Sequence, residues 1–272
     1  METRQVGCGK AEGETTGGAK GLAGRRALIV GGSGGIGAAV AEALARRGAG
    51  LVIHGGHSRS RLEASLSRCR AAQKQAALSA GIGLPEAEPL LLPLERPADL
   101  LEKLPGLGPL DILVCAFGPF LHAPLERTGA ADWERLALLD LALPGALVSA
   151  ALPGMMAAGW GRILLFGGTR TDAIRAYSSN AAYAAAKTGL AVLVKSVAAE
   201  YAAAGIGAFL LCPGLVDTEY LDADLRSGLA SRAPRGKLLD ASQIGEFAAG
   251  LIADEPALAS GAVINLDGGL KF

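Results

Sequence analysis

From Arg26 onward, short apolar runs alternate with longer stretches that are rich in alanine or amphipathic. Continuous apolar runs bounded by turn residues are typical of strands buried in a parallel sheet, whereas the longer stretches have the length and periodicity of helices. The pattern predicts seven strands, at residues 27–30, 51–54, 90–94, 111–115, 162–166, 206–211 and 262–266. It predicts helices between them, one ending near residue 47 and others at about 58–79, 132–158 with a kink at Pro144, 180–203 and 241–253.

This alternation of strand and helix is continuous, without a repeat or a low-complexity linker. It predicts an α/β fold, namely a single doubly wound Rossmann-type domain whose seven-stranded parallel sheet has helices on both faces. The 272 residues are enough for one such domain with a large core. Residues 1–24 are rich in Gly, Thr and charge and lack the apolar core of a signal peptide, so we expect a flexible segment there and the domain at 25–272.

Composition narrows the class of partner. Lysine plus arginine equals aspartate plus glutamate at 26 each, which gives no electrostatic case for nucleic acid or an anionic membrane. The uncharged stretch at 141–161 contains two prolines, which favours a buried or interfacial helix over a membrane span. Four cysteines without CxxC spacing indicate buried free thiols in a reducing compartment, hence the cytoplasm. We therefore expect a small-molecule partner.

A glycine-rich turn separates the first strand from the first helix. Glycines at this place allow close backbone approach, and the helix N-terminus offers free N–H groups and a positive dipole end to a phosphate. The turn therefore predicts a phosphate site formed by Gly31, Ser33, Gly35, Ile36 and Gly37.

The same turn also spells G-x-S-x-G, the nucleophile elbow of α/β-hydrolases, with Ser33 as the nucleophile. A hydrolase of that kind needs a histidine base late in the chain, but the three histidines are His54, His57 and His122. This alternative is therefore disfavoured. The histidines also lack the helical spacing of a metal site, so we expect them in loops or the core.

Tyr183 and Lys187 lie four residues apart in a stretch that is expected to be helical, so both side chains share one helix face. A fixed cation beside a phenol favours its ionised form, which is one way to make tyrosine a general acid/base. The alternative from these two residues alone is a coincidence, with the tyrosine packed and the lysine solvated.

Taken in order on one α/β domain, these features resemble the classical short-chain dehydrogenase/reductase (SDR) family. The family's T-G-x-x-x-G-x-G turn corresponds to residues 30–37, with valine in place of threonine, and Tyr183-x-x-x-Lys187 matches its catalytic pair. The strand at 111–115, the proline-glycine stretch at 212–218 and the glycine pair at 268–269 follow in the family's order. The resemblance covers the chain from about residue 24 to 272.

The resemblance implies an NAD(P)-dependent oxidoreductase that moves a hydride between nicotinamide C4 and a carbonyl or alcohol carbon, similar to 3-oxoacyl-[acyl-carrier-protein] reductases. Tyr183 would donate the proton, and Lys187 would lower the pKa of Tyr183 and bind the nicotinamide ribose. The family's cofactor contacts would correspond here to residues near the nicotinamide, Pro213, Gly214, Val216 and Thr218, and residues near the adenosine, Leu94, Ala116 and Gly118.

Two departures from the family bear on catalysis. Gly168 stands where the family has a serine that hydrogen-bonds the substrate oxygen, and we expect Thr169, or else Thr171, to supply that hydroxyl. Asp140 stands where a helix asparagine supports a proton-relay water. Its carboxylate would either interact directly with Lys187 or cap a helix beside the Pro144 kink.

The segment after the second strand bears on the choice of dinucleotide. NAD-specific relatives have an acid there for the ribose hydroxyls, whereas this chain has none until Glu63. Ser58 and Arg59 would instead hold a 2′-phosphate, with Arg61 and His57 nearby. We therefore expect NADP(H) to be preferred, with NAD(H) as the alternative.

The resulting function is the reduction of a 3-oxoacyl compound or a similar ketone to an alcohol. An alternative from another class is a catalytically weak dinucleotide-binding sensor or assembly protein, suggested by the altered serine and asparagine positions. Substrate choice would rest on the loop at about 218–234, which we expect to be a mobile helical lid. Kinship with the family also implies a homo-oligomer, a tetramer or dimer.

Overall fold

A computed structural model describes residues 21–271 of the chain. Its centre is a seven-stranded sheet in the order β3-β2-β1-β4-β5-β6-β9, and every neighbouring pair is parallel. This arrangement confirms the predicted doubly wound α/β fold. The strands are β1 (Arg26–Val30), β2 (Gly50–Gly55), β3 (Glu88–Leu91), β4 (Ile112–Cys115), β5 (Gly161–Phe166), β6 (Ile206–Pro213) and β9 (Val263–Leu266).

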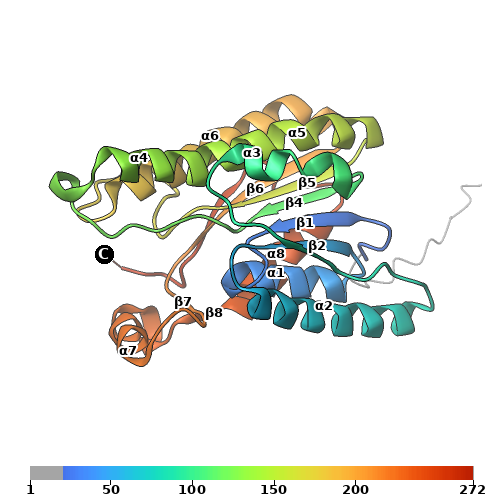
Figure 1. Ribbon diagram of the computed structural model, residues 1–272, viewed down its shortest axis with the longest axis horizontal. Helices are drawn as coiled ribbons and strands as arrows, with labels where there is room; N and C mark the ends of the chain where they lie inside the picture. Colours follow the sequence, from blue (N-terminus) through green and yellow to red (C-terminus); the bar gives the residue numbers. More distant parts are fainter. Residues whose placement is uncertain (1–20, 272) are drawn as a thin grey trace, which may run out of the picture.

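Helices cover both faces of this sheet (Figure 1). One face carries α1 (Gly35–Arg46), α2 (Arg59–Ala80) and α8 (Ala241–Ala253). The other carries α3 (Pro97–Leu101), α4 (Ala130–Ala137), α5 (Leu143–Ala158) and α6 (Ala181–Tyr201). Short 3₁₀ turns lie at Leu104–Leu107, Leu125–Arg127, Ala202–Ala204 and Pro234–Gly236.

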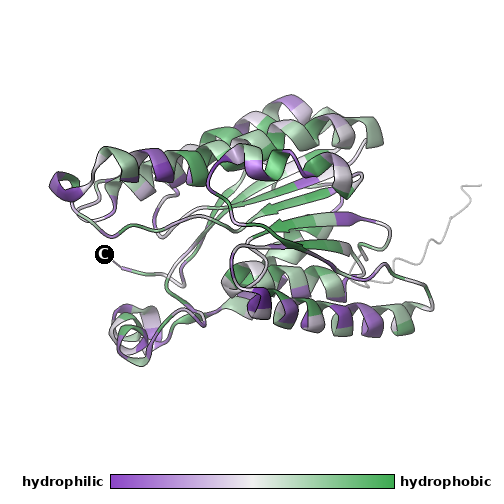
Figure 2. Ribbon diagram, in the orientation of Figure 1, coloured by the Kyte–Doolittle hydropathy of each residue, from purple (hydrophilic) through white to green (hydrophobic). Residues whose placement is uncertain are grey.

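The sheet separates two hydrophobic cores, because successive residues of a strand point to opposite faces. In β1, Ile29 packs into the core shared with α1, α2 and α8, whereas Leu28 packs into the core shared with α5 and α6. Figure 2 shows the apolar colour concentrated on the strands and on the helix faces that meet them. The five inner strands β2, β1, β4, β5 and β6 are buried on both faces, which is why they read as continuous apolar runs, whereas the edge strands β3 and β9 are partly exposed.

The third strand is Glu88–Leu91 rather than the predicted 90–94. Leu92 still donates its N–H to Gly55 O at 2.9 Å, but Pro93 has no N–H with which to continue the ladder. The strand therefore ends earlier than the apolar pattern suggests.

The long helix predicted at 132–158 contains a π-helical turn, Leu138–Ala142, between α4 and α5. Pro144 lies in the first turn of α5, so its missing N–H cannot bond to the carbonyl of Asp140. The irregularity thus precedes the predicted kink site. It places Asp140 in a wider turn, and such turns are frequent at functional sites.

After β6 the chain forms a small parallel pair, β7 (Val216–Asp217) and β8 (Leu239–Asp240), with α7 (Ala223–Arg232) between them. This segment projects from the end of the sheet (Figure 1). A helical lid was expected at this place. The two strands were not predicted, because strands of only two residues show no recognisable periodicity. No residue of α7 is buried.

Three further expectations concern the ends, the cysteines and the membrane. Most of the segment 1–24, which was predicted to be flexible, lies outside the described residues, and so does Cys8. At the end of this segment Leu22 is buried and donates its N–H to Arg47 O at 2.6 Å. Cys69, Cys115 and Cys212 are buried free thiols. Two helical stretches, Ala130–Ala158 and Ala181–Ala204, are long and apolar enough to cross a membrane, but both belong to the layer that covers the sheet.

Candidate active site

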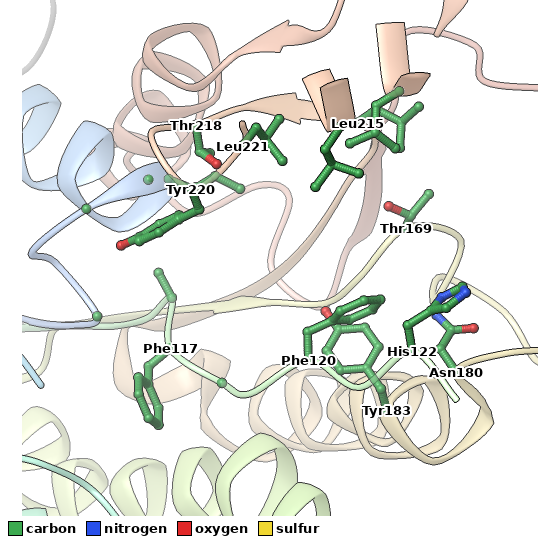
Figure 3. A pocket seen from close by; sticks show the side chains of 18 of the residues that line it. Phe117, Phe120, His122, Thr169, Asn180, Tyr183, Leu215, Thr218, Tyr220 and Leu221 are labelled. Carbon is green, nitrogen blue, oxygen red and sulfur yellow. The ribbon is translucent and has the colours of Figure 1, made fainter. Parts of the chain in front are cut away.

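A cavity of about 1320 Å³ lies at the carboxyl ends of the strands. Its walls come from the segments that follow β1, β2, β4, β5 and β6, together with α7 (Figure 3). Ligands of doubly wound sheets bind at this edge. The predicted site residues that line it are Gly31, Ser33, Gly35, Ile36, Ser58, Ala116, Gly118, Thr169, Tyr183 and Thr218.

The glycine turn brings the N-terminus of α1 to this cavity. Gly31 has φ +82°, and a Cβ on it would lie 2.9 Å from Ala116 O. A Cβ on Gly37 would overlap the Gly31 carbonyl oxygen, so the first turn of α1 packs directly on the backbone. Glycine is required at both places by close approach, as the sequence predicted. The N–H of Gly35 already holds an anion, because it donates to Glu219 Oε1 at 2.9 Å and Oε2 at 3.1 Å.

His54, near the end of β2, accepts a hydrogen bond from the backbone of this turn. Its ring is fully buried, with Nδ1 3.1 Å from the Gly31 N–H and Nε2 2.8 Å from Leu92 O. Because Gly31 can only donate and Leu92 O can only accept, the ring is neutral with its proton on Nε2. Burial lowers the pKa of His54, against the opposing effect of the Leu92 bond. The core role expected for this histidine is thus a bridge between two segments beside the cofactor turn.

Tyr183 and Lys187 share a face of α6, as the sequence predicts, with Nζ 5.9 Å from the centre of the phenol ring. Lys187 is buried and lies 3.0 Å from Oδ1 of the fully buried Asp140. The direct interaction considered above is therefore observed, and the capping alternative is wrong because the carboxylate faces the lysine. Neither oxygen of Asp140 has a well-aligned hydrogen bond, so the pair is held mainly by charge.

The electrostatics of Tyr183 differ from the expectation. Burial raises the pKa of Tyr183 above its ordinary value, and the charge of Asp140 raises it further. The net shift is therefore opposite to the predicted lowering, because burial and the Asp140 carboxylate beside the Lys187 ammonium both favour the neutral phenol. Burial also raises the pKa of Asp140, with Lys187 opposing. Tyr183 is therefore held as a phenol.

Gly118 passes directly over the charged pair. A Cβ at this position would overlap Asp140 Oδ1 and would lie 3.0 Å from Lys187 Nζ. Only a residue without a side chain lets the segment after β4 cross here. This explains why position 118, in Cys115-Ala116-Phe117-Gly118, is glycine.

The substrate hydroxyl expected from Thr169 or Thr171 is not directed at Tyr183. Thr169 Oγ1 donates to Pro213 O at 3.1 Å, and in Figure 3 its side chain lies apart from Tyr183. Thr171 Oγ1 is buried and donates to Gly168 O at 3.0 Å. Gly168 itself faces the tyrosine, since a Cβ there would lie 2.8 Å from the phenol oxygen. The prediction for Thr169 is therefore wrong in this conformation, because neighbouring carbonyls satisfy both hydroxyls.

The far end of the cavity is basic. Gly56, His57, Ser58 and Arg61 line it, whereas Arg59 does not. Ser58 also caps α2 by accepting from the N–H of Arg61 at 3.3 Å. Arg61 lies 5.2 Å from the centre of the Tyr220 ring. Arg61, rather than the predicted Arg59, thus brings a cation to the cavity wall.

Other predicted contacts lie behind the cavity wall. Leu94 is buried in the core on the face of the sheet that carries α5 and α6. Val216 lies in β7, opposite Leu239 of β8. Pro213 accepts the Thr169 bond, and a Cβ on Gly214 would lie 2.7 Å from Asp267 Cα, so both fix the backbone that carries Leu215. Their roles as cofactor contacts remain predictions. No cluster of three or more metal-ligating side chains occurs within residues 21–271.

Comparison with known proteins identifies the family. The family model described as enoyl-(acyl carrier protein) reductase matches residues 31–271. A 3-oxoacyl-[acyl-carrier-protein] reductase of Escherichia coli strain K12 is 33% identical over 257 residues, covering 91% of this chain and 97% of that protein. The chain is a short-chain dehydrogenase/reductase. A second SDR relative, cis-4-hydroxycyclohexanecarboxylate dehydrogenase of Sinomonas cyclohexanicum, is 33% identical over 249 residues, or 90% of this chain and 96% of that one.

A solved structure supports the same assignment of this SDR chain. A 3-oxoacyl (acyl-carrier-protein) reductase from Agrobacterium tumefaciens C58 with NADP bound superimposes with a TM-score of 0.79 at 30% identity. The match covers 92% of this chain and 96% of that one. The fold and the family are therefore settled together.

Aromatic residues also form the wall of the cavity around Tyr183. Phe120 packs edge-on against Tyr183 with ring centres 5.0 Å apart, and His122 lies 6.5 Å from Phe120 (Figure 3). Asn180 and Tyr220 also line the cavity. Tyr220 lies in the loop at 218–234 that was expected to form the lid, but nothing in the sequence indicated that this loop would reach the glycine turn through Glu219.

Proposed function

We propose that this SDR reduces a carbonyl compound to an alcohol with NADP(H), and that Tyr183 is the proton donor. The observation that carries the proposal is the position of Tyr183 on the wall of the cavity whose other end is the glycine turn. A proton donor and an anion-binding helix N-terminus then share one space, as an oxidoreductase of this family requires.

The residues at the turn fit a dinucleotide. The N–H of Gly35 already binds a carboxylate, and a Cβ on Gly34 would overlap Glu219 Oε1 and the Tyr220 hydroxyl, so glycine lets other groups approach the turn closely. Gly31, Ser33 and Ile36 would hold the pyrophosphate region. When bound, the nicotinamide supplies or accepts the hydride at C4.

Tyr183 serves the reductive direction in its protonated form. Burial and Asp140 raise its pKa, so the phenol keeps the proton that a substrate oxygen receives. Lys187 lies within 5.9 Å of the ring and stabilises the phenolate that remains after transfer. Asp140 acts through Lys187 as a positioning residue, since it holds the ammonium at 3.0 Å.

A preference for NADP(H) follows from the basic end of the cavity. Arg61 and Ser58 would bind a 2′-phosphate. Among the described residues after β2 that line the cavity, none is an acid that could bind free ribose hydroxyls. The related Agrobacterium reductase carries NADP. Arg61 takes the role that we first gave to Arg59.

The substrate is a small ketone or 3-oxoacyl compound. The wall opposite Tyr183 is apolar, formed by Leu215 and by Leu221, Leu225 and Leu229 on or beside α7, and Arg170 and Arg232 also line the cavity. Relatives act, by their names, on 3-oxoacyl-[acyl-carrier-protein] and on a hydroxycyclohexane carboxylate. We expect the enzyme to work in the cytoplasm as a homo-oligomer, a tetramer or dimer.

A second function is favoured by one observation. The serine position is Gly168, and neighbouring carbonyls engage both threonine hydroxyls, so substrate orientation lacks its usual donor. A dinucleotide-binding sensor on the SDR fold would need no such donor. Turnover separates the two functions.

The test is oxidation of NADPH with a panel of β-ketoacyl thioesters, oxo acids, diketones and aldehydes, with the wild-type chain and Tyr183→Phe. We expect turnover of at least one carbonyl by the wild type and loss of about 10²–10⁴-fold in kcat in the variant. NADPH binding without turnover of any carbonyl would favour the sensor.

A further inference from the structure

The turn that follows β7 reaches into the dinucleotide end of the cavity. Leu221 N–H bonds to Thr218 O at 3.2 Å, and the turn so formed carries Glu219 and Tyr220 at its tip. Both oxygens of the Glu219 carboxylate lie within hydrogen-bond distance of the Gly35 N–H, at 2.9 and 3.1 Å. A negative side chain from the far end of the sequence thus rests on the N-terminus of α1.

This N–H group is one that a pyrophosphate would use. The first turn of α1 offers its donors and its positive dipole end to whichever anion reaches it. A Cβ built on Gly34 would overlap both Glu219 Oε1 and the Tyr220 hydroxyl, so the space above the turn is filled by these two side chains. A phosphate and the Glu219 carboxylate cannot occupy that space together.

Tyr220 extends the same contact to the basic end. Its ring centre lies 5.2 Å from the Arg61 guanidinium, the group that would bind the 2′-phosphate (Figure 3 shows Tyr220 within the cavity). Arg61 also stabilises the Tyr220 phenolate, while burial raises the pKa of the phenol. One short turn therefore engages both anion-binding features of the cavity.

The turn is attached to the domain by few contacts. Arg226 of α7 pairs with Asp217 at 2.8 Å and donates to Thr218 O at 3.4 Å, which links α7 to the base of the turn. None of the residues of α7 is buried. Segments with little buried apolar surface open at low free-energy cost, so α7 and the turn can move as a unit.

We propose that Glu219 occupies the pyrophosphate subsite in the free protein and must leave it before the dinucleotide binds, so that Glu219 sets the cofactor affinity. The inference rests on the proposed function, since it assumes that NADP(H) is the ligand. The apparent dissociation constant equals the intrinsic one divided by the fraction of molecules whose subsite is open. Because the turn with Glu219 is continuous with α7, departure of Glu219 would also free the segment that carries Leu221, Leu225 and Leu229 to move. Cofactor binding would thus be coupled to movement of this wall of the cavity.

The experiment combines two measurements on the full chain. NADPH affinity is measured by calorimetry, and amide hydrogen exchange of residues 216–232 and of Gly35 is measured without cofactor. The variants are Glu219→Ala and the milder Glu219→Gln, and the matched control is Glu200→Gln, which removes an exposed carboxylate from the last turn of α6, outside the monitored segment. We expect the Glu219 variants to bind NADPH about fivefold or more tightly and to exchange faster in the free state, because the carboxylate that rests on the N-terminus of α1 is lost. Glu200→Gln should change neither.

Each other result is decisive. Unchanged affinity and unchanged exchange in Glu219→Ala would overturn the proposal. Tighter binding without faster exchange would also overturn it, because Glu219 would then only repel the bound phosphates. If neither the wild type nor a variant binds NADPH, the proposed function fails, while the exchange data still show whether Glu219 holds the turn.

Discussion

Replacing Asp140 with asparagine tests the electrostatics of the active site. The change keeps the shape of the side chain but removes the charge that offsets Lys187 at 3.0 Å. The contribution of Asp140 to the raised pKa of Tyr183 is then lost, whereas the Lys187 ammonium remains. The pKa of Tyr183 should therefore fall.

The size of the change follows from two distances. Lys187 Nζ lies 5.9 Å from the Tyr183 ring centre and 3.0 Å from Asp140 Oδ1, so this carboxylate oxygen lies no further from the ring centre than their sum, about 8.9 Å. With an effective dielectric constant of about 20, a unit charge at that distance contributes about 332/(20 × 8.9), or about 1.9 kcal/mol. At about 1.4 kcal/mol for each pKa unit, Asp140→Asn should lower the pKa of Tyr183 by at least about one. The loss of a partner for the buried lysine should also cost up to about 3–5 kcal/mol of stability.

The assay is a titration that follows the ultraviolet absorbance of tyrosinate. The chain has four tyrosines, so each titration is repeated with Tyr183→Phe on the same background, and the difference isolates Tyr183. Circular dichroism on each variant provides the folding control. Where turnover is measurable, the alkaline limb of the reduction rate should move to lower pH with the phenol.

An unchanged or raised pKa of Tyr183 in a folded Asp140→Asn variant would refute this reasoning. It would mean that the Asp140 charge has no effective field at the phenol, and that burial governs the pKa of Tyr183. The role of Asp140 would then be limited to packing in the π-helical turn.

Two further predictions concern His54 and Arg61. Burial lowers the pKa of His54 below its unfolded value of about 6.5, so its contribution to stability is present above that pH and is lost as pH falls toward the folded pKa. Urea unfolding at several pH values should show that the free energy of unfolding falls by at most about 1.4 kcal/mol per pH unit because of this group. The fall should be smaller in His54→Gln, and an equal pH dependence in the two proteins would contradict the prediction. Arg61→Ala should weaken NADPH binding tenfold or more, by about 1.4 kcal/mol, with little effect on the binding of NADH. Arg59→Ala should change the binding of neither cofactor. If calorimetry gives the reverse ranking of the two variants, Arg59 and not Arg61 binds the 2′-phosphate.

The sequence was sufficient where a single local rule governs the structure. Continuous apolar runs predicted the five inner strands of the sheet, because strands covered on both faces have no polar side, whereas the bounds of the exposed edge strand β3 were missed. The requirement for glycine at Gly31 and Gly37 followed from the strand-to-helix turn. The shared helix face of Tyr183 and Lys187 followed from the 3.6-residue period.

It was insufficient where side chains from distant segments meet. Thr169 could not be known to bond to Pro213, since that contact joins residues 44 apart in sequence. Asp140 changes the electrostatics of Tyr183 only because a π-helical turn directs it at Lys187. Glu219 reaches Gly35 across 184 residues, and no periodicity or motif encodes such a contact.

The central claim is that this SDR transfers a hydride from NADPH to a carbonyl with Tyr183 as proton donor. It is tested most directly by single-turnover reactions with NADPH deuterated at the transferable C4 position, analysed by mass spectrometry of the alcohol. The account predicts one deuterium on the product carbon with the wild type, and bound NADPH without product with Tyr183→Phe. Deuterium transfer at equal rates in both proteins, or none in a wild type that binds NADPH, would contradict it.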